Sequence, residues 1–172
     1  MALLQTGIAK SGAVAAYEIE NSVRFDDGDS AYLSRTFTSS AIWTFSCWVK
    51  RANLSLAMGI LEGGLHFNSG DTITAVGLTT TALFRDPSAW YHILVSNSGL
   101  YVNGVSLGSV TTSALTNPDI GRNGTDYYDG YLAEVYFIDG TAYDADYFGE
   151  LSSTTNQWIP LDSDDVKDAV TF

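Results

Sequence analysis

Short apolar runs separated by turn residues follow one another along most of the chain. The stretch at residues 90–109 reads WYHILVSNSGLYVNGVSLGS and contains three such runs. The Asn103-Gly104 pair divides the second run from the third, and Asn-Gly is a strong hairpin signal because both residues tolerate a positive φ. An Asn-Ser-Gly turn at residues 97–99 divides the first run from the second. The pattern predicts an antiparallel meander, which is typical of an all-β domain.

The same pattern extends over the rest of the chain. Predicted strands lie at residues 14–19, 22–25, 31–37, 41–50, 58–62, 65–68, 71–78, 81–86, 89–96, 100–103, 105–110 and 130–139. The separators are rich in Asn, Asp, Ser and Gly, which favour turns. Short strands at this spacing predict a two-sheet sandwich or a barrel.

Two of the predicted strands, 41–50 and 89–96, are apolar on both faces. A strand of this kind suits the centre of a curved sheet whose outer side is covered by loops. Cys47 alternates with large apolar residues in the first strand, so we expect a buried, inert thiol. His92 in the second strand, and His66 in the run at 65–68, are predicted to be packed strand residues rather than ligands.

The length of 172 residues fits one domain with extensions at both ends. Residues 1–20 are predicted to be an N-terminal arm or attachment strand, and residues 21–160 a sandwich. Residues 161–172 are acidic and then apolar, which indicates a tail or a last strand. One short helical turn, capped by Asp144, is predicted just before that tail.

The formal net charge of −12 argues against a nucleic-acid partner, which requires a basic surface, and against an anionic membrane surface. No apolar stretch approaches the roughly 20 residues that span a membrane. The N-terminal sequence lacks a basic residue before its apolar part, so it is not predicted to be a secretory signal, and synthesis in a cytoplasm is expected.

Five motifs in order carry a resemblance to a known family. They are WTFSCWVK at 43–50, WYH at 90–92, YVNG at 101–104, IGR at 120–122 and DGYLAEV at 129–135. Over about residues 22–150 the chain resembles the laminin-G-like domains of the concanavalin A-like lectin and glucanase superfamily. The resemblance implies an antiparallel jelly-roll sandwich. Members commonly carry an acidic residue where this chain has Ala133, while the following Glu134 is retained.

A narrower resemblance, carried by YEIENSVRFDDGDSAYLSRTFTSS, IGR, YYDGYLAEVYFIDGTAY and DYFGE, is to laminin-G-type domains of structural proteins in tailed phages, notably cyanobacterial ones. It implies a non-enzymatic protein on the virion surface that decorates the capsid or tail. The implied partners are other virion proteins and further copies of the chain. Within the arm, Leu3, Leu4 and Ile8 are the predicted attachment residues. The alternative is a module that binds glycans on host cells.

The loop GRNGTDYYDG at residues 121–130 is the predicted ligand site. Asp126 and Asp129 could offer oxygen ligands to Ca²⁺, and Tyr127 and Tyr128 could offer ring faces to a sugar. The alternative is an ordinary turn with packed tyrosines. No other cofactor is expected.

Catalysis is not expected. Retaining glycoside hydrolysis needs two carboxylates a few ångströms apart. The nearest pair, Glu134 and Asp139, is five residues apart, which on a flat strand would place the two side chains on opposite faces.

Overall fold

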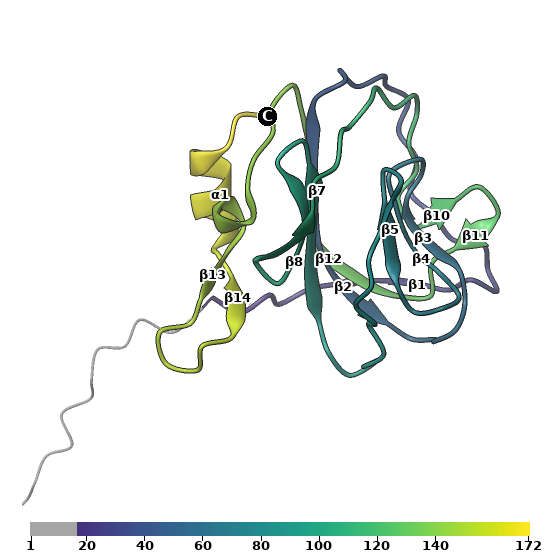
Figure 1. Ribbon diagram of the computed structural model, residues 1–172, viewed down its shortest axis with the longest axis horizontal. Helices are drawn as coiled ribbons and strands as arrows, with labels where there is room; N and C mark the ends of the chain where they lie inside the picture. Colours follow the sequence, from purple (N-terminus) through teal and green to yellow (C-terminus); the bar gives the residue numbers. More distant parts are fainter. Residues whose placement is uncertain (1–16) are drawn as a thin grey trace, which may run out of the picture.

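The computed structural model describes residues 17–172, which form three layers (Figure 1). A six-stranded sheet lies in the middle, a four-stranded sheet covers one of its faces, and a C-terminal unit covers the other. Residues 1–16 lie outside the described part, and so do the predicted attachment residues Leu3, Leu4 and Ile8.

The six-stranded sheet is antiparallel and has the order β1-β12-β2-β7-β8-β9. Its strands are β1 (Val23–Phe25), β2 (Trp43–Arg51), β7 (Tyr91–Ser96), β8 (Gly99–Val102), β9 (Val105–Gly108) and β12 (Gly130–Asp139). The predicted meander is confirmed as β7-β8-β9. Asn103 and Gly104 form its second turn, with φ values of 50° and 75°.

The second sheet has the order β3-β4-β5-β6 and is also antiparallel. Its strands are β3 (Met58–Leu61), β4 (Leu65–Phe67), β5 (Ile73–Ala75) and β6 (Leu78–Thr79). A two-stranded hairpin, β10 (Arg122–Asn123) and β11 (Asp126–Tyr127), lies beside it. The core between the two sheets includes Trp43, Phe45, Cys47, Val49, Met58, Ile60, Leu65, Phe67, Ile73, Ile93 and Val95.

The third layer covers the outer face of the six-stranded sheet. It comprises a 3-10 helix (Ala145–Tyr147), β13 (Gly149–Leu151), β14 (Trp158–Pro160) and α1 (Ser163–Ala169). A second buried cluster joins it to the sheet and contains Leu94, Ile138, Phe148, Val166 and Val170. The central strands are therefore buried on both faces, although the outer face holds polar residues such as Thr44 and Ser46. A hairpin and a helix cover that outer face, whereas loops were predicted.

The C-terminal prediction needs two corrections. Residues 161–172 do not form a last strand, because α1 occupies most of them, and the Asp162 carboxylate caps it by accepting a hydrogen bond from the Asp164 N–H at 2.9 Å. The predicted turn near Asp144 is present, but the Asp144 side chain does not cap it. That carboxylate instead accepts a hydrogen bond from the Tyr101 hydroxyl at 3.3 Å.

Two predicted strands are absent, a third is broken, and of the predicted strand at 14–19 the described residues 17–19 form no strand. Residues 31–37 make only the isolated bridge Leu33–Ile120, and residues 81–86 form no strand. The run at 71–78 is interrupted at Val76 and Gly77, whose φ values of 46° and 86° turn the chain between β5 and β6. Only some apolar residues of these runs face the core: Phe84 does so from an irregular loop, whereas Tyr32, Leu33 and Leu83 are exposed.

A β-bulge divides β12 between Ala133 and Tyr136, with Glu134 at a φ of 45°. The extra residue changes which side chains share a face. Leu132 and Phe137 are five positions apart, yet both pack against the core between the sheets. The assumption of a flat strand for Glu134 and Asp139 is therefore wrong.

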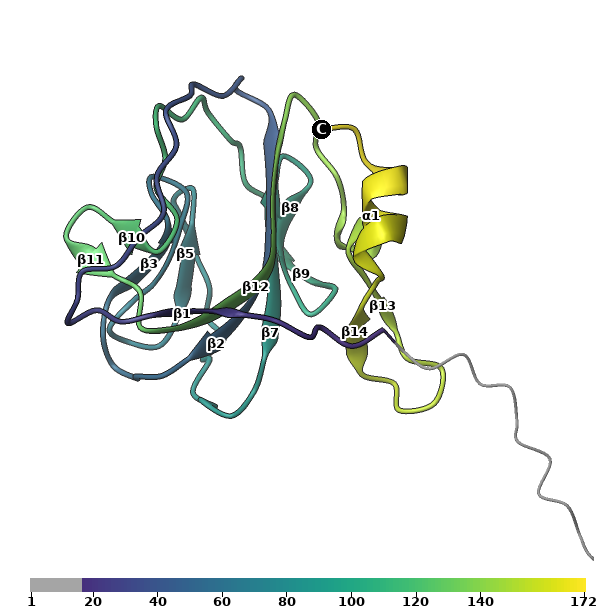
Figure 2. The same ribbon diagram turned by 180° about the vertical axis from the view of Figure 1, so that it is seen from behind.

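The described chain is thus mostly antiparallel β-structure with one α-helix, and it is compatible with an all-β sandwich. Figure 2 shows residues 17–22 continuing from β1 across the molecule toward β14. Among the described residues, no helix has the length and apolar character needed to cross a membrane.

Candidate functional site

The predicted site loop forms the β10-β11 hairpin and the segment that leads into β12. The hairpin is seated on β3 at Gly59, where an added Cβ would lie 2.0 Å from the backbone nitrogen of Asn123. This close approach holds the hairpin against the four-stranded sheet. The four predicted site residues then point in different directions, because the chain turns inward after Tyr127.

Tyr128 is a core residue with no exposed surface. Its ring packs edge-on against Phe25, with the ring centroids 6.1 Å apart, and its hydroxyl donates to the Lys50 carbonyl oxygen at 2.9 Å. Burial raises the pKa of the Tyr128 hydroxyl, so it stays protonated. This ring has no face to offer to a sugar.

Asp129 is also buried, and its partners are protein groups. Its carboxylate lies 2.5 Å from the Arg24 guanidinium and accepts a hydrogen bond from the Asn53 side chain. Asp26 and Asp27 place carboxylate oxygens within 4.8 Å of it, whereas Asp126 does not belong to this group. The predicted pair Asp126 and Asp129 is thus not brought together. Because Arg24 already neutralises Asp129, the acidic group does not by itself indicate a cation.

Tyr127 and Asp126 remain at the surface, both half-buried. The Tyr127 ring lies beside Tyr32, with centroids 6.3 Å apart, and the Arg122 guanidinium lies 4.1 Å from the centre of the Tyr32 ring. Arg122 is held in place by Asp119, whose carboxylate is 2.5 Å away. We call Tyr32, Tyr127 and Arg122 the Tyr32 patch. Sequence reasoning missed Tyr32, since nothing local indicates that it meets residues ninety positions later.

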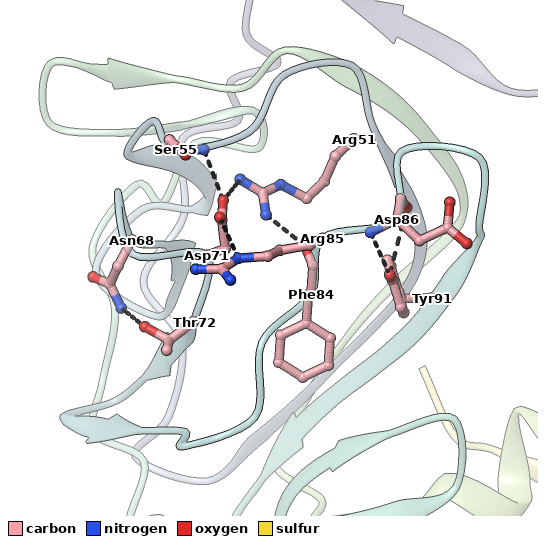
Figure 3. Close-up of polar contacts among 9 residues, drawn as sticks. All are labelled: Arg51, Ser55, Asn68, Asp71, Thr72, Phe84, Arg85, Asp86 and Tyr91. Atoms are coloured by element: carbon pink, nitrogen blue, oxygen red, sulfur yellow. Dashed lines mark hydrogen bonds and ion pairs between the residues drawn. The ribbon is translucent and has the colours of Figure 1, made fainter.

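A second group of charges lies at the end of the four-stranded sheet, with Asp71 and Arg51 buried and Arg85 exposed (Figure 3). The Asp71 carboxylate accepts from Arg51 and Arg85, each at 3.0 Å, and from the Ser55 backbone N–H at 2.7 Å. That backbone bond and the two guanidinium groups hold the pKa of Asp71 below its usual value.

Arg51 completes this network from the core side. It donates to the Phe84 carbonyl oxygen at 2.6 Å and lies over the Phe67 ring at 4.4 Å. The network ties the loops that carry Ser55 and Phe84 to the sheet. Among the described residues, Arg51 Nε has no hydrogen-bond partner. The other guanidinium nitrogens of Arg51 bond to Asp71 and Phe84, which is the arrangement of a structural ion pair.

His92 is wholly buried between the central sheet and the C-terminal layer. Trp158 Nε1 donates to His92 Nδ1 at 3.1 Å, so His92 Nε2 carries the proton and donates to the Ser46 hydroxyl at 2.9 Å. Burial lowers the pKa of His92 to about 3. The prediction of a packed strand histidine is confirmed, and Cys47 is likewise buried, as predicted.

The two carboxylates considered for hydrolysis have separate partners. Glu134 accepts hydrogen bonds from the hydroxyls of Tyr17, at 3.1 Å, and Tyr136. Asp139, at the far end of β12, accepts from the Ser40 backbone N–H at 2.7 Å. The two carboxylates thus bond to different segments of the chain, Glu134 to Tyr17 and Tyr136 and Asp139 to Ser40.

The comparisons with known proteins add nothing to this geometry: no protein-family model matches the sequence, and a search of curated proteins found no match.

Proposed function

We propose that this protein is a non-enzymatic accessory protein on the surface of a tailed-phage particle, with a laminin-G-like, concanavalin A-like jelly roll as its body. Its partners are then other virion proteins of the capsid or tail. The synthesis site is the host cytoplasm, and the working location is the virion surface.

The observation that carries the proposal is where the resemblance motifs lie in the fold. WTFSCWVK forms most of β2, YVNG ends β8 and turns toward β9, and GYLAEV begins β12. These strands and β7 are neighbours in one sheet, in the order β12-β2-β7-β8. Motifs separated by up to about ninety residues thus build one continuous surface, as expected if they belong to one ancestral domain rather than to chance matches.

The start of the described chain suits attachment by an arm. Tyr17 is tied to Glu134, but Glu18 and residues 20–22 are exposed. The chain that precedes Tyr17 therefore begins at the surface of the folded body. An extension that starts at the surface can reach a neighbouring protein without disturbing the core.

The test is incorporation into particles. A chain that begins at residue 17, and a second variant with Leu3, Leu4 and Ile8 changed to Ser, should fold with an unchanged circular dichroism spectrum and be absent from purified particles. A matched control changes Gln5, Thr6 and Lys10 to Ala and should incorporate normally. Normal incorporation of the truncated chain, or failure of antibody-gold to label any particle, would refute the proposal.

A second candidate function, glycan binding, is favoured by the Tyr32 patch. Tyr32 is 43% exposed and lies beside Tyr127, and Asp126 precedes Tyr127 in β11 of the β10-β11 hairpin. Exposed aromatic rings next to polar groups are suited to the apolar faces and hydroxyls of a sugar. This candidate replaces the buried Tyr128 with Tyr32 and keeps the predicted Tyr127 and Asp126.

A glycan array probed with and without Ca²⁺ tests the second candidate. Tyr32→Ala and Tyr127→Ala should each remove binding, and Asp126→Ala should remove any Ca²⁺-dependent part. Tyr147, an exposed tyrosine on the C-terminal layer, provides the matched control as Tyr147→Ala. Retention of binding by both patch variants would exclude the Tyr32 patch as the sugar site.

A further inference from the structure

The second half of β12 has one open edge among the described residues. β1 pairs only with Gly130–Leu132, and the bulge at Glu134 ends that pairing. Beyond the bulge, Tyr136–Asp139 pair with β2 on one side, and no strand of residues 17–172 pairs on the other. A strand edge of this kind presents backbone N–H and C=O groups that can accept an added strand.

An apolar groove follows this open edge. Its volume is about 640 Å³, which is within the range of roughly 300–1,000 Å³ seen for binding pockets. Its lining consists mainly of Leu33, Phe37, Ile120, Val135, Phe137 and Phe172. Three of these side chains are well exposed: Leu33 at 53%, Val135 at 37% and Phe172 at 68%. An open edge beside exposed apolar side chains indicates a site for an extended apolar peptide.

The chain itself supplies a peptide of this chemistry. Residues 1–16, MALLQTGIAKSGAVAA, hold Leu3, Leu4 and Ile8, and their only charged side chain is Lys10. Sixteen residues in extended form reach about 50 Å, which is enough to cross from one copy of the body to another. The groove carries few charges of its own, with Arg35 and Asp139 at its margin.

The place where the arm starts favours a second copy, rather than the same chain, as the source of the arm that fills the groove. The segment at 17–22 leaves the line of β1 and, with Trp48, Trp90 and Pro160, borders a hollow on the outer face of the six-stranded sheet. The Tyr17 hydroxyl is bonded to Glu134, directly beside Val135 and Tyr136 of the groove. At about 3.3 Å per residue, Ile8 lies about 30 Å along an extended arm from Tyr17, and Leu3 and Leu4 lie farther still, whereas the open edge at Tyr136–Asp139 spans only about 13 Å. An extended arm thus carries these three side chains past the groove of its own body and within reach of a second copy.

We infer that the groove along the open edge of β12 receives the N-terminal arm of a second copy of this chain, with Leu3, Leu4 and Ile8 as the apolar contacts. This inference concerns the purified protein alone and does not depend on a particle. It adds self-association to the proposed function, in which the arm contacts other virion proteins.

The first test is the mass of the purified protein by sedimentation at tens of micromolar. The full chain should be a dimer or larger, and a chain that begins at residue 17 should be a monomer. Val135→Lys should weaken association at least tenfold, whereas Val105→Lys, the same change on the exposed edge strand β9, should leave it unchanged. A monomeric full chain, or equal effects of the two lysine variants, would overturn the inference.

The second test asks which copy supplies the arm. One protein carries Leu4→Cys and another Ser34→Cys, at the margin of the groove; Ser106→Cys on β9 is the control, and the native Cys47 is buried. Oxidation of the Leu4→Cys and Ser34→Cys mixture should give a disulfide-linked heterodimer in several-fold higher yield than with Ser106→Cys. Equal yields, or a doubly substituted chain that closes only on itself, would overturn the inference.

The two tests remain distinguishable from the particle experiment. A protein that is monomeric yet incorporates through its arm would overturn the self-association and leave the accessory function intact. A protein that associates through the groove but is absent from particles would overturn the accessory function and leave the self-association intact.

Discussion

His92 is the residue whose environment predicts a measurable pH dependence. Its pKa in the folded protein is about 3, whereas an unfolded histidine titrates near about 6.5. Between these values the unfolded chain binds one more proton than the folded chain. The contribution of the neutral, buried His92 to the free energy of unfolding is therefore fully present above about pH 6.5. Below that pH it falls by about 1.4 kcal/mol for each pH unit, down to the pKa of His92 in the folded protein.

The variant His92→Gln should lose this part of the pH dependence, because glutamine does not titrate. Urea unfolding at several pH values from about 5.5 to 7, above the pKa values of about 3.9 and 4.3 for Asp and Glu in an unfolded chain, measures it. Ser106→Ala on the exposed strand β9 is the control, since it removes no titratable group and should leave the slope of the parent protein. Equal slopes for the parent and His92→Gln would show that His92 does not cause the effect.

Single residues were predictable from sequence where alternation decided their burial. Cys47 and His92 lie in long strands flanked by large apolar residues, so their burial followed from the pattern. Tyr127 and Tyr128 are adjacent and chemically identical, yet Tyr127 is half-buried at the surface and Tyr128 is wholly buried. Only the inward course of the chain after β11 distinguishes them, and that course depends on Phe25, which is distant in sequence.

At the scale of secondary structure, the sequence predicted best the long strand β12 and the hairpin whose turn is the Asn-Gly pair. β12 has the predicted bounds, and the Asn103-Gly104 hairpin is present. The runs at 31–37 and 81–86 have the same apolar composition, but their backbones do not pair in ladders. Composition therefore predicted core contacts only in part: Phe84 is in the core, whereas Leu33 and Leu83 are exposed. Strand pairing depended on partners from elsewhere in the chain. The bulge in β12 had no sequence signal, because Glu134 is not a glycine.

The tip of the β8-β9 hairpin packs against the C-terminal layer. An added Cβ on Gly104 would lie 2.3 Å from the Trp158 ring, and the φ there is 75°. Gly77 has a comparable φ of 86° but open space around it. Gly77→Ala should therefore lower the free energy of unfolding by about 1 kcal/mol from backbone strain alone.

Gly104→Ala should lower it by at least about 1 kcal/mol more than Gly77→Ala, because Trp158 must also move. Urea unfolding of the two variants gives the difference directly. A fluorescence change should accompany only Gly104→Ala, since it alone displaces an indole. Equal destabilisation of the two variants would mean that the hairpin and the C-terminal layer are not in firm contact.

At the scale of the whole molecule, the C-terminal layer decides whether the body is a two-layer sandwich with a tail or a three-layer unit. Sequence reasoning predicted a tail or a last strand because residues 161–172 are acidic and then apolar. In the structure, Val166 and Val170 pack on Leu94 and Ile138 of the central sheet. The face that they cover also carries the buried His92. A short amphipathic helix of seven residues was not distinguishable from a solvated tail without that face.

A chain that ends at residue 156, and so lacks β14 and α1, should be less stable by about 3 kcal/mol or more, because two buried valines alone account for about 1.5 kcal/mol each. It should also bind a hydrophobic dye, since Leu94, Ile138 and Phe148 lose their cover. A chain that ends at Val170 removes only exposed residues and serves as the control. Thermal unfolding with dye binding compares the two. Near-equal melting temperatures would show that the C-terminal layer is a docked appendage, whereas a large loss would make it part of one cooperative three-layer fold.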